Sequence, residues 1–445
     1  MLDDECIHTI IDKYFKGNGL TSHQIESYDD YIDNIFPMII SQFFPFKLSF
    51  ADNKIKEITL NVTDINIETP TYTENNGCTK KMTPNIARLR NFTYSLTVFI
   101  NISVEIKLIE DNNEINLPIK VLKDIIFTKI PVIVKSKYCN YRYDILSECC
   151  FDPGGYTIIN GNEKVLISQE KITPNMIQTY EISKNNTKYG HVSEVRSSND
   201  KTFGNTKTIS IKITKKPDMF SNLIFISLPH IKEEIPMSII FRALGCLSDK
   251  EILYFIKDND NSELDEKLSH IIQTSLLIDT GVQTQGEAIA YISRKLSTNY
   301  TFNSATKISY CKNILEKEYL LHLSDNLSKL HFTGLMVNRL LKCYLKVNKC
   351  SDRDSYYNKR MESGGVLMGN LTIQGMSKVI KDMKVHITKE VNSGIWNIKE
   401  DHSDIINDIN IQKIIKKTYI ENILKGALAT GNWGIKNNKN KQGVS

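Results

Sequence analysis

The carboxylate cluster best suited to chemistry in this sequence is Asp352-Arg353-Asp354. Two acids one residue apart can hold Mg²⁺, as they do in polymerases. The guanidinium of Arg353 lies between them, however, and can neutralise both through charge-assisted hydrogen bonds. We therefore predict a structural ion-pair cluster at Asp352, Arg353 and Asp354. Lys359 and Arg360 follow a few residues later, where they either clamp a phosphate or balance the same two acids.

Histidine and cysteine show no metal-binding pattern. The nine histidines stand at positions 8, 23, 191, 230, 270, 322, 331, 386 and 402, without metal-ligand spacing. The nine cysteines include no C-x-x-C pair of the kind found in zinc ribbons and redox sites. Phosphate-binding loops (G-x-x-x-x-G-K-[ST]), H-E-x-x-H helices and G-x-S-x-G elbows are also missing from the sequence. We predict reduced thiols, no catalytic residue and no metal site or cofactor in this chain.

The composition is that of a folded protein. The chain has 445 residues, of which 41% are hydrophobic and 24% charged, and this excludes a disordered or collagen-like protein. The acidic start Met1-Leu2-Asp3-Asp4-Glu5 differs from a basic secretory signal, and no apolar run approaches the ~18 residues that span a bilayer. We therefore expect an intracellular protein of two to four domains, without a membrane partner.

Basic residues concentrate at the carboxyl end. From residue 411 onward there are seven lysines and one acid, so this segment carries a net charge of +6, whereas the remainder of the chain carries −1. Lys436, Lys439 and Lys441 are the last three of these lysines. Such a segment suits a polyanion, but a solvated lysine-rich tail has the same composition.

The first third of the chain has the periodicity of β-strands. Apolar residues alternate strictly with mostly polar ones from Leu96 to Leu108, which predicts a long strand with one buried face. Further strands are expected at 115–121 and 127–134, in an antiparallel sheet. Asn160-Gly161 lies between two short β-prone runs and predicts a hairpin. A helix is expected over 24–44 from its apolar spacing.

Helical periodicity dominates after a last group of strands in 191–230. Ser248-x-x-Glu251 and Thr284-x-x-Glu287 both have the pattern of a capping box in front of apolar helical positions. Further helices are expected around 327–344 and 411–424. The fold class that follows is α+β, with a β-rich first third and a mostly helical middle.

Six motifs in order resemble the second-largest, beta-type subunit of multisubunit DNA-directed RNA polymerases, in its eukaryotic, archaeal and large-DNA-virus form. They cover nearly the whole chain. The stretches that carry the resemblance are Thr83–Tyr94, Ile130–Cys139, Asp152–Tyr156 with Ile158–Glu170, Glu234–Pro236 with Phe241–Gly245, Asp352–Asp354 with Lys359-Arg360, and Ala427–Gly434.

The resemblance implies a domain arrangement and a set of partners. A β-rich protrusion would comprise residues 1–190 and 361–427, a mostly helical α+β lobe 191–360, and the start of the fork 428–445. The implied partners are the remainder of the same subunit, the largest subunit, smaller subunits, the DNA template and the RNA–DNA hybrid.

The resemblance also implies roles for individual residues. Lys436, Lys439 and Lys441 would approach the hybrid, where lysine acts as a point charge on phosphate. Lys164 and Gln169 would face the active-centre cleft. Arg353, Lys359 and Arg360 would lie where lobe, protrusion and fork meet, and packing and ion pairing are the expected tasks there.

Three departures from the family pattern affect the interpretation. Ser351 stands where relatives have an acid, and the loop from Ile435 to Gln442 differs from theirs. The chain also stops at Ser445, before the regions that carry the family's nucleotide-binding residues, the Mg²⁺ chemistry of the assembled enzyme and the family's zinc site. We therefore expect no polymerisation by this chain alone. A gene interrupted by an intein or intron, or a fragment, is favoured over a natural split.

Two hypotheses follow. In the first, the chain is the amino-terminal portion of a polymerase subunit and lines the nucleic-acid cleft of the assembled enzyme. In the second, it is a free-standing interaction or decoy module that reuses the protrusion and lobe. The sequence does not distinguish between three intracellular locations, which are the nucleus, a nucleoid and a cytoplasmic virus factory.

Overall fold

The computed structural model describes residues 4–50, 55–110, 113–143, 148–182, 188–199, 204, 206–215, 222–257, 262–277, 281–296, 304–393, 405–407 and 409–433. The chain forms two compact units. Unit 1 comprises Met1–Gln169 and Met361–Ser445, and unit 2 comprises Glu170–Arg360. The chain passes from unit 1 to unit 2 within β10 (Gln169–Ile172) and returns within β16 (Lys359–Glu362), and these two strands pair with each other.

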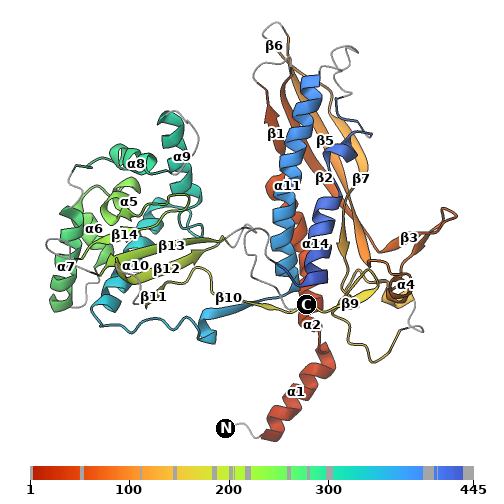
Figure 1. The fold of residues 1–445 in the computed structure, drawn as a ribbon, viewed down its shortest axis with the longest axis horizontal. Coiled ribbons are helices and arrows are strands. Elements are labelled where there is room, and N and C mark those ends of the chain that lie inside the picture. The colour runs from red at the N-terminus through yellow and green to blue at the C-terminus, as the bar shows by residue number, and fades with distance from the viewer. Residues whose placement is uncertain are drawn as a thin grey trace. The chain divides into compact units, whose positions relative to one another are not determined.

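An antiparallel sheet of five strands forms the centre of unit 1 (Figure 1). Its long strands β2 and β5 pair along most of their lengths, and β7 pairs with the other side of β5. Every second residue of β5 from Leu96 to Leu108 is at least 95% buried, as the alternation predicts. The strands are β1 (Phe46–Ser49), β2 (Ile55–Glu68), β5 (Ser95–Glu110), β6 (Asn113–Asn116) and β7 (Lys120–Pro131).

Helices cover one face of this sheet. The 30-residue helix α11 packs against α14, α2 and α3, while α14 also packs on β7 and α3 contacts β2. The predicted helix over 24–44 is a continuous helical stretch with one π-helical turn, Tyr31–Ile35. The helices of unit 1 are α1 (Asp4–Asn18), α2 (Ser22–Asp30), α3 (Phe36–Phe43), α4 (Pro84–Leu89), α11 (Gly364–Ser393), α13 (Ile411–Ile414) and α14 (Thr418–Thr430).

Two small hairpins and a 3₁₀ turn complete unit 1. β3 (Thr71–Thr73) pairs with β4 (Thr79–Lys81), and β8 (Thr157–Ile159) pairs with β9 (Asn162–Lys164). The 3₁₀ turn is Asn140–Tyr143. The β8–β9 pair is the hairpin that Asn160-Gly161 predicts.

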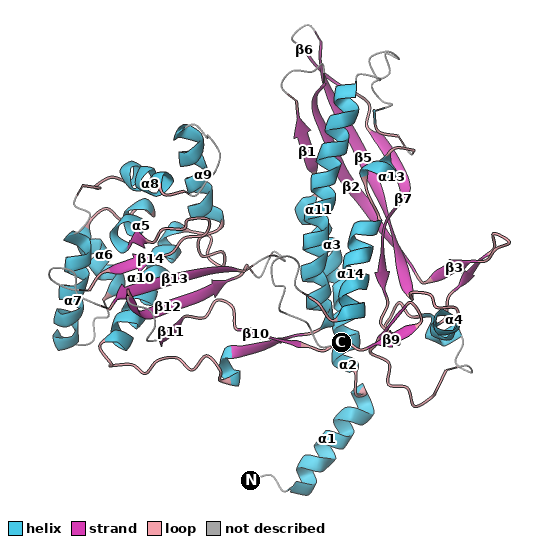
Figure 2. Cartoon of the chain, viewed as in Figure 1, coloured by secondary structure: helices cyan, strands magenta, loops and turns pink. Residues whose placement is uncertain are grey.

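In its described residues, unit 2 combines an antiparallel sheet in the order β11-β12-β13-β14-β15 with α-helices (Figure 2). Helix α10 packs on β11, β12 and β13, and α5 packs on β14 and β15. The strands are β11 (Gln178–Glu181), β12 (Tyr189–Ser197), β13 (Lys207–Thr214), β14 (Ile224–Ile226) and β15 (Ile235–Pro236). The helices are α5 (Met237–Ala243), α6 (Asp249–Ile256), α7 (Ser262–Leu277), α8 (Gln285–Arg294), α9 (Ser304–Lys317) and α10 (Asn326–Tyr344), with a 3₁₀ turn at Tyr356–Asn358.

The structure confirms one predicted capping box and corrects the other. Thr284 accepts a hydrogen bond from the backbone N–H of Glu287, whose carboxylate accepts from the N–H of Thr284 in return. Ser248 is the N-cap residue of α6, but its side chain makes no capping hydrogen bond. Instead, the carboxylate of Glu251 lies 3.6 Å from the sulfur of Cys246.

Three further expectations compare with the structure as follows. The α+β fold class is confirmed. The strand expected at 115–121 is wrong in its bounds, since only 115–116 belong to β6 and 120–121 already belong to β7. The strand expected at 127–134 overlaps the end of β7, which begins seven residues earlier and ends three residues earlier than predicted. None of the helices within the described part of the chain combines the length and apolar character that crossing a bilayer requires.

Candidate nucleic-acid interface

The β8–β9 hairpin is shaped by its two turn residues. Asn160 has φ 49° and Gly161 has φ 79°, the left-handed values that a tight two-residue hairpin turn requires. A Cβ atom at Gly161 would lie 2.5 Å from Oδ1 of Asn91, so the turn packs closely against the loop after α4. The N–H of Gly161 donates to the carbonyl of Phe92 at 3.0 Å. Only glycine satisfies both requirements at this position.

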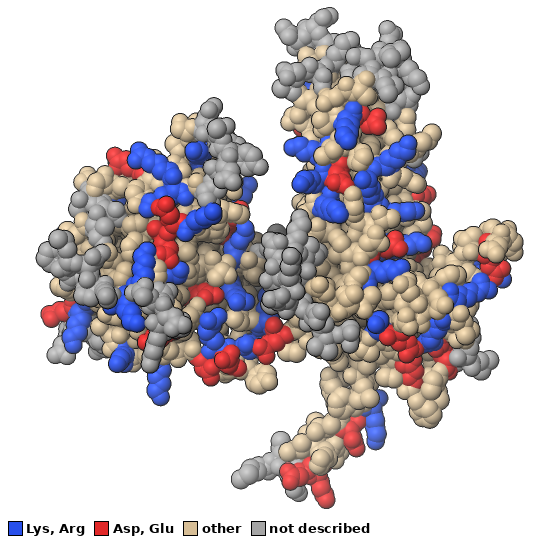
Figure 3. All heavy atoms as spheres, in the orientation of Figure 1, with Lys and Arg blue, Asp and Glu red and all other residues tan. Residues whose placement is uncertain are grey.

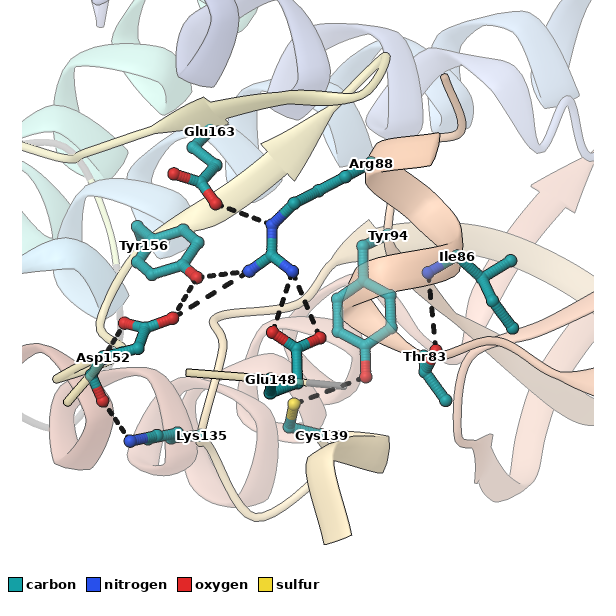
Figure 4. A network of polar contacts seen from close by, with 11 residues as sticks. Thr83, Ile86, Arg88, Tyr94, Lys135, Cys139, Glu148, Asp152, Tyr156 and Glu163 are labelled. Carbon is teal, nitrogen blue, oxygen red and sulfur yellow. Dashed lines mark hydrogen bonds and ion pairs between the residues drawn. The ribbon is translucent and has the colours of Figure 1, made fainter. Parts of the chain in front are cut away.

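Arg88 of α4 holds the hairpin in place through hydrogen bonds and ion pairs in a network of carboxylates (Figure 4). Its Nε donates to Glu163 at 2.6 Å, and its NH1 donates to both oxygens of Glu148, at 3.1 and 2.8 Å. Its NH2 donates to the hydroxyl of Tyr156 and lies 3.9 Å from the carboxylate of Asp152. One guanidinium thereby joins the Thr83–Tyr94 motif to Glu148 and to the motif of Asp152–Tyr156 with Ile158–Glu170, at least 60 positions further along the chain.

The electrostatics of this network favour a permanently charged cation. Burial alone would lower the pKa of Arg88, but its hydrogen bonds with Glu148 and Glu163 raise the pKa above the usual value. Burial, and then the hydrogen bond to Asp152, raise the pKa of Tyr156, so its hydroxyl stays protonated. Arg88 and Tyr156 therefore both keep their protons near neutral pH, which suits a structural network.

Lys164 and Gln169 precede and follow the buried residue Leu166 in the chain. Both side chains are half-buried, and neither forms an ion pair or side-chain hydrogen bond with any described residue. Leu166, between them, is 6% exposed, and its carbonyl accepts a hydrogen bond from the Gln24 side chain. Since neighbours in a strand point to opposite faces, Lys164 is directed away from Glu163 and its arginine partner.

The end of α14 lies against the same hairpin. Ile159 and Leu166 from the hairpin pack with Leu367 of α11 and Leu428 of α14 in a small apolar cluster. Helix α14 ends at Gly431, which has φ 70° and donates its N–H to the carbonyl of Ala427. The structure thus brings the described part of the Ala427–Gly434 motif, through Leu428, to the hairpin that carries Lys164. The predicted contacts Lys436, Lys439 and Lys441 lie outside the described residues.

The predicted ion-pair cluster has different partners in the structure. The guanidinium of Arg353 stacks over the ring of Tyr180, 4.4 Å from its centroid. Asp352 accepts a hydrogen bond from the N–H of Asp354, which makes a local turn. Among the described residues, neither acid forms an ion pair with Arg353. The reason is local: the carboxylate of Asp352 accepts from the backbone of Asp354, while the guanidinium of Arg353 lies over the ring of Tyr180.

Lys359 and Arg360 also have partners other than Asp352 and Asp354. The ammonium of Lys359 pairs with Glu170 of β10 at 2.5 Å. Arg360 donates to the carbonyl oxygens of Tyr357 and Lys359. Lys359 therefore joins β16 to β10, whereas Arg360 binds the backbone directly before it.

Sequence reasoning missed Arg88 and Glu148 as the centre of a network. Arg88 lies within the Thr83–Tyr94 motif, which is the signal that could have singled it out, but Glu148 lies outside every motif. Surface charge does not indicate another candidate interface. On the face that Figure 3 shows, basic and acidic side chains are interspersed over both units. The hairpin and the end of α14 remain the candidate interface.

Comparison with known proteins identifies relatives over almost the entire chain. A family model described as RNA polymerase beta subunit matches residues 19–422. DNA-directed RNA polymerase II subunit 2 of Arabidopsis thaliana is 32% identical over 98% of this chain, and subunit RPB2 of Eremothecium gossypii is 31% identical over 96%. The chain spans only 37% and 36% of those two proteins. DNA-directed RNA polymerase subunit Rpo2N of Methanococcus vannielii is 28% identical, and the chain covers 80% of it.

Proposed function

Since the chain belongs to the family of RNA polymerase beta subunits, we propose that it is the amino-terminal part of the second-largest subunit of a DNA-directed RNA polymerase. The observation that carries this proposal is the family match over residues 19–422. The 80% coverage of Rpo2N supports it, because that relative is itself a polymerase subunit of similar length. The chain would work inside the cell, in a nucleus, a nucleoid or a virus factory.

In this proposal the chain supplies a protrusion (residues 1–190 and 361–427), a lobe (191–360) and the start of the fork (428–445). The division into two compact units supports two domains, with the first crossover at Gln169 and the return at Arg360. The topology, in which unit 2 interrupts unit 1, suits a lobe inserted into a protrusion.

The proposed task of the chain is to line the nucleic-acid cleft. Lys164, Gln169 and the basic segment with Lys436, Lys439 and Lys441 would contact the backbone of the hybrid or template. This proposal is supported by the apolar cluster that holds the end of α14 beside the hairpin of Lys164. Nucleotide addition, with its Mg²⁺, would belong to the assembled enzyme, and this chain would be inactive alone.

Assembly provides the first test. The chain is co-expressed with the remainder of the subunit and with the largest subunit, and the mixture is analysed by size-exclusion chromatography and by transcription on a primed template. We expect one complex that transcribes, and no transcription by the chain alone. A monodisperse chain that ignores both partners would contradict the proposal and favour the decoy module.

The salt dependence of hybrid binding provides the second test. Each lysine that neutralises a phosphate contributes about one to the slope of log K against log salt concentration. Replacing Lys436, Lys439 and Lys441 together by alanine should lower the slope of the assembled enzyme by about 3, and Lys164→Ala by about 1. Lys80→Ala is the control, since Lys80 pairs with Glu74 at 3.0 Å. An unchanged slope in the first two variants would remove these lysines from the interface.

A further inference from the structure

Three side chains that can bind metal meet at one edge of unit 2. His191 lies in β12, Cys343 lies in the last turn of α10, and Cys350 lies in the loop that follows α10. One ring nitrogen of His191 and the two sulfur atoms all lie within 4.8 Å of one another. Because 152 residues separate His191 from Cys343, spacing in the sequence gives no sign of this group.

Backbone and ring contacts hold the three residues in place. Ser351, directly after Cys350, donates its N–H to the carbonyl of Thr179 at 2.7 Å and accepts from the N–H of Thr179 at 3.1 Å. The loop carrying Cys350 is therefore attached to β11. The ring of His191 packs edge-on against Tyr344, the neighbour of Cys343, at 5.5 Å between centroids.

The separations are near those of a tetrahedral zinc site. The two sulfur atoms lie 3.0 Å apart. Zinc bonds of about 2.3 Å to sulfur place two such ligands about 3.8 Å apart in a tetrahedron, so the two sulfur atoms would move apart by less than about 1 Å to hold an ion. Glu181 is the nearest candidate in the ladder for a fourth ligand, since it is directly opposite His191 in the β11–β12 pair and shares its face, although its carboxylate lies outside the group of three.

One ring nitrogen of His191 is available to a metal ion. Nδ1 of His191 is buried and has no hydrogen-bond partner in the described part of the chain. Cysteine binds zinc as the thiolate, so an ion would displace a proton from Cys343 and from Cys350 on binding.

We propose that His191, Cys343 and Cys350 form a zinc site, with Glu181 or water as the fourth ligand. Two thiolates and an imidazole are a ligand set that favours zinc over the hard cations Mg²⁺ and Ca²⁺. The ion fastens the end of α10 to the β11–β12 edge, so its role is structural. The site follows from these contacts alone and does not depend on the polymerase assignment.

Metal analysis of the full-length chain tests the site. The 445-residue chain is purified under reducing conditions without chelator, and its zinc content is measured by mass spectrometry of the elements. We expect about one zinc per chain. Cobalt exchanged into the site should give the thiolate-to-cobalt absorption that is typical of cysteine ligation.

Variants separate the ligands from other thiols. Cys350→Ser changes an exposed residue and His191→Gln keeps a similar volume, and each should reduce the bound zinc at least tenfold. Cys78→Ser, an exposed cysteine of unit 1, is the matched control and should retain the ion. Three results would overturn the proposal. The first is a wild-type chain that contains no zinc, and the second is a Cys78→Ser variant that loses as much zinc as the ligand variants. The third is an intact mass two hydrogens lower than expected, which indicates a Cys343–Cys350 disulfide.

Discussion

Replacing Arg88 by methionine should destabilise unit 1 more than any other single charge removal at its surface. The substitution keeps an apolar stem of similar length but removes the guanidinium that joins Glu148, Glu163 and Tyr156. What remains is a carboxylate at Glu148 whose side chain is only 3% exposed. A buried charge without its partner is the costly part of such a change.

The expected cost can be divided between the two partners. Breaking a buried ion pair by removing one partner costs about 3 to 5 kcal/mol. The side chain of Arg88 is 23% exposed, so we take the lower limit and expect about 3 kcal/mol from Glu148. The Glu163 side chain is 53% exposed, and such a pair contributes less than about 1 kcal/mol. Adding Glu148→Gln to Arg88→Met should recover most of the loss, because the amide carries no charge.

Tryptophan fluorescence during urea unfolding is the appropriate assay. The sequence of unit 2, Glu170–Arg360, contains no tryptophan, whereas Trp433 belongs to unit 1, so the signal does not come from unit 2. Arg90→Met is the matched control. The side chain of Arg90 is 50% exposed and lies 3.9 Å from its acid, Glu74, so its loss should cost less than about 1 kcal/mol.

Two outcomes would refute this reasoning. One is an Arg88→Met variant whose free energy of unfolding equals that of Arg90→Met. The other is a double variant in which the effects of Arg88→Met and Glu148→Gln simply add, since residues in direct contact should show a coupling energy.

Three further predictions concern other parts of the chain. Gly365→Ala would place a Cβ atom 1.9 Å from the carbonyl oxygen of Ser27 and should lower the free energy of unfolding by about 1 to 3 kcal/mol in the same fluorescence assay. A Cβ atom at Gly426 would have nothing within 4 Å, so Gly426→Ala should stabilise α14 by up to about 1 kcal/mol. Thr284→Ala removes the capping box of α8 and should cost about 1 kcal/mol, seen as faster amide hydrogen exchange in α8. Hydrogen bonds from a lysine and a tyrosine lower the pKa of Asp33 in the folded state. The ionised Asp33 side chain therefore stabilises the fold at a pH above the unfolded pKa of about 3.9, and this stabilisation is lost as the pH falls through the folded pKa. Acid titration of unfolding should therefore be less steep in Asp33→Asn, and identical curves would contradict this assignment.

Local patterns in the sequence predicted the elements well, because they depend on residues that are close in the chain. The alternation in β5 has a period that only a strand can satisfy, and its buried face is the one expected. Asn160-Gly161 specifies its own turn through backbone geometry. The Ser248 prediction was wrong because the same residues can cap a helix or turn to other neighbours, and Glu251 lies beside Cys246 instead.

The sequence by itself determined the fold class, the family and the motifs from which a nucleic-acid interface is proposed. Only the tertiary structure decided which distant residues meet: Arg88 with Glu148, Leu166 with Leu428, and His191 with Cys343. The reason is physical. Periodicity and turn chemistry act over a few residues, whereas a contact across 60 to 262 positions depends on how sheets and helices pack, and no local pattern encodes that.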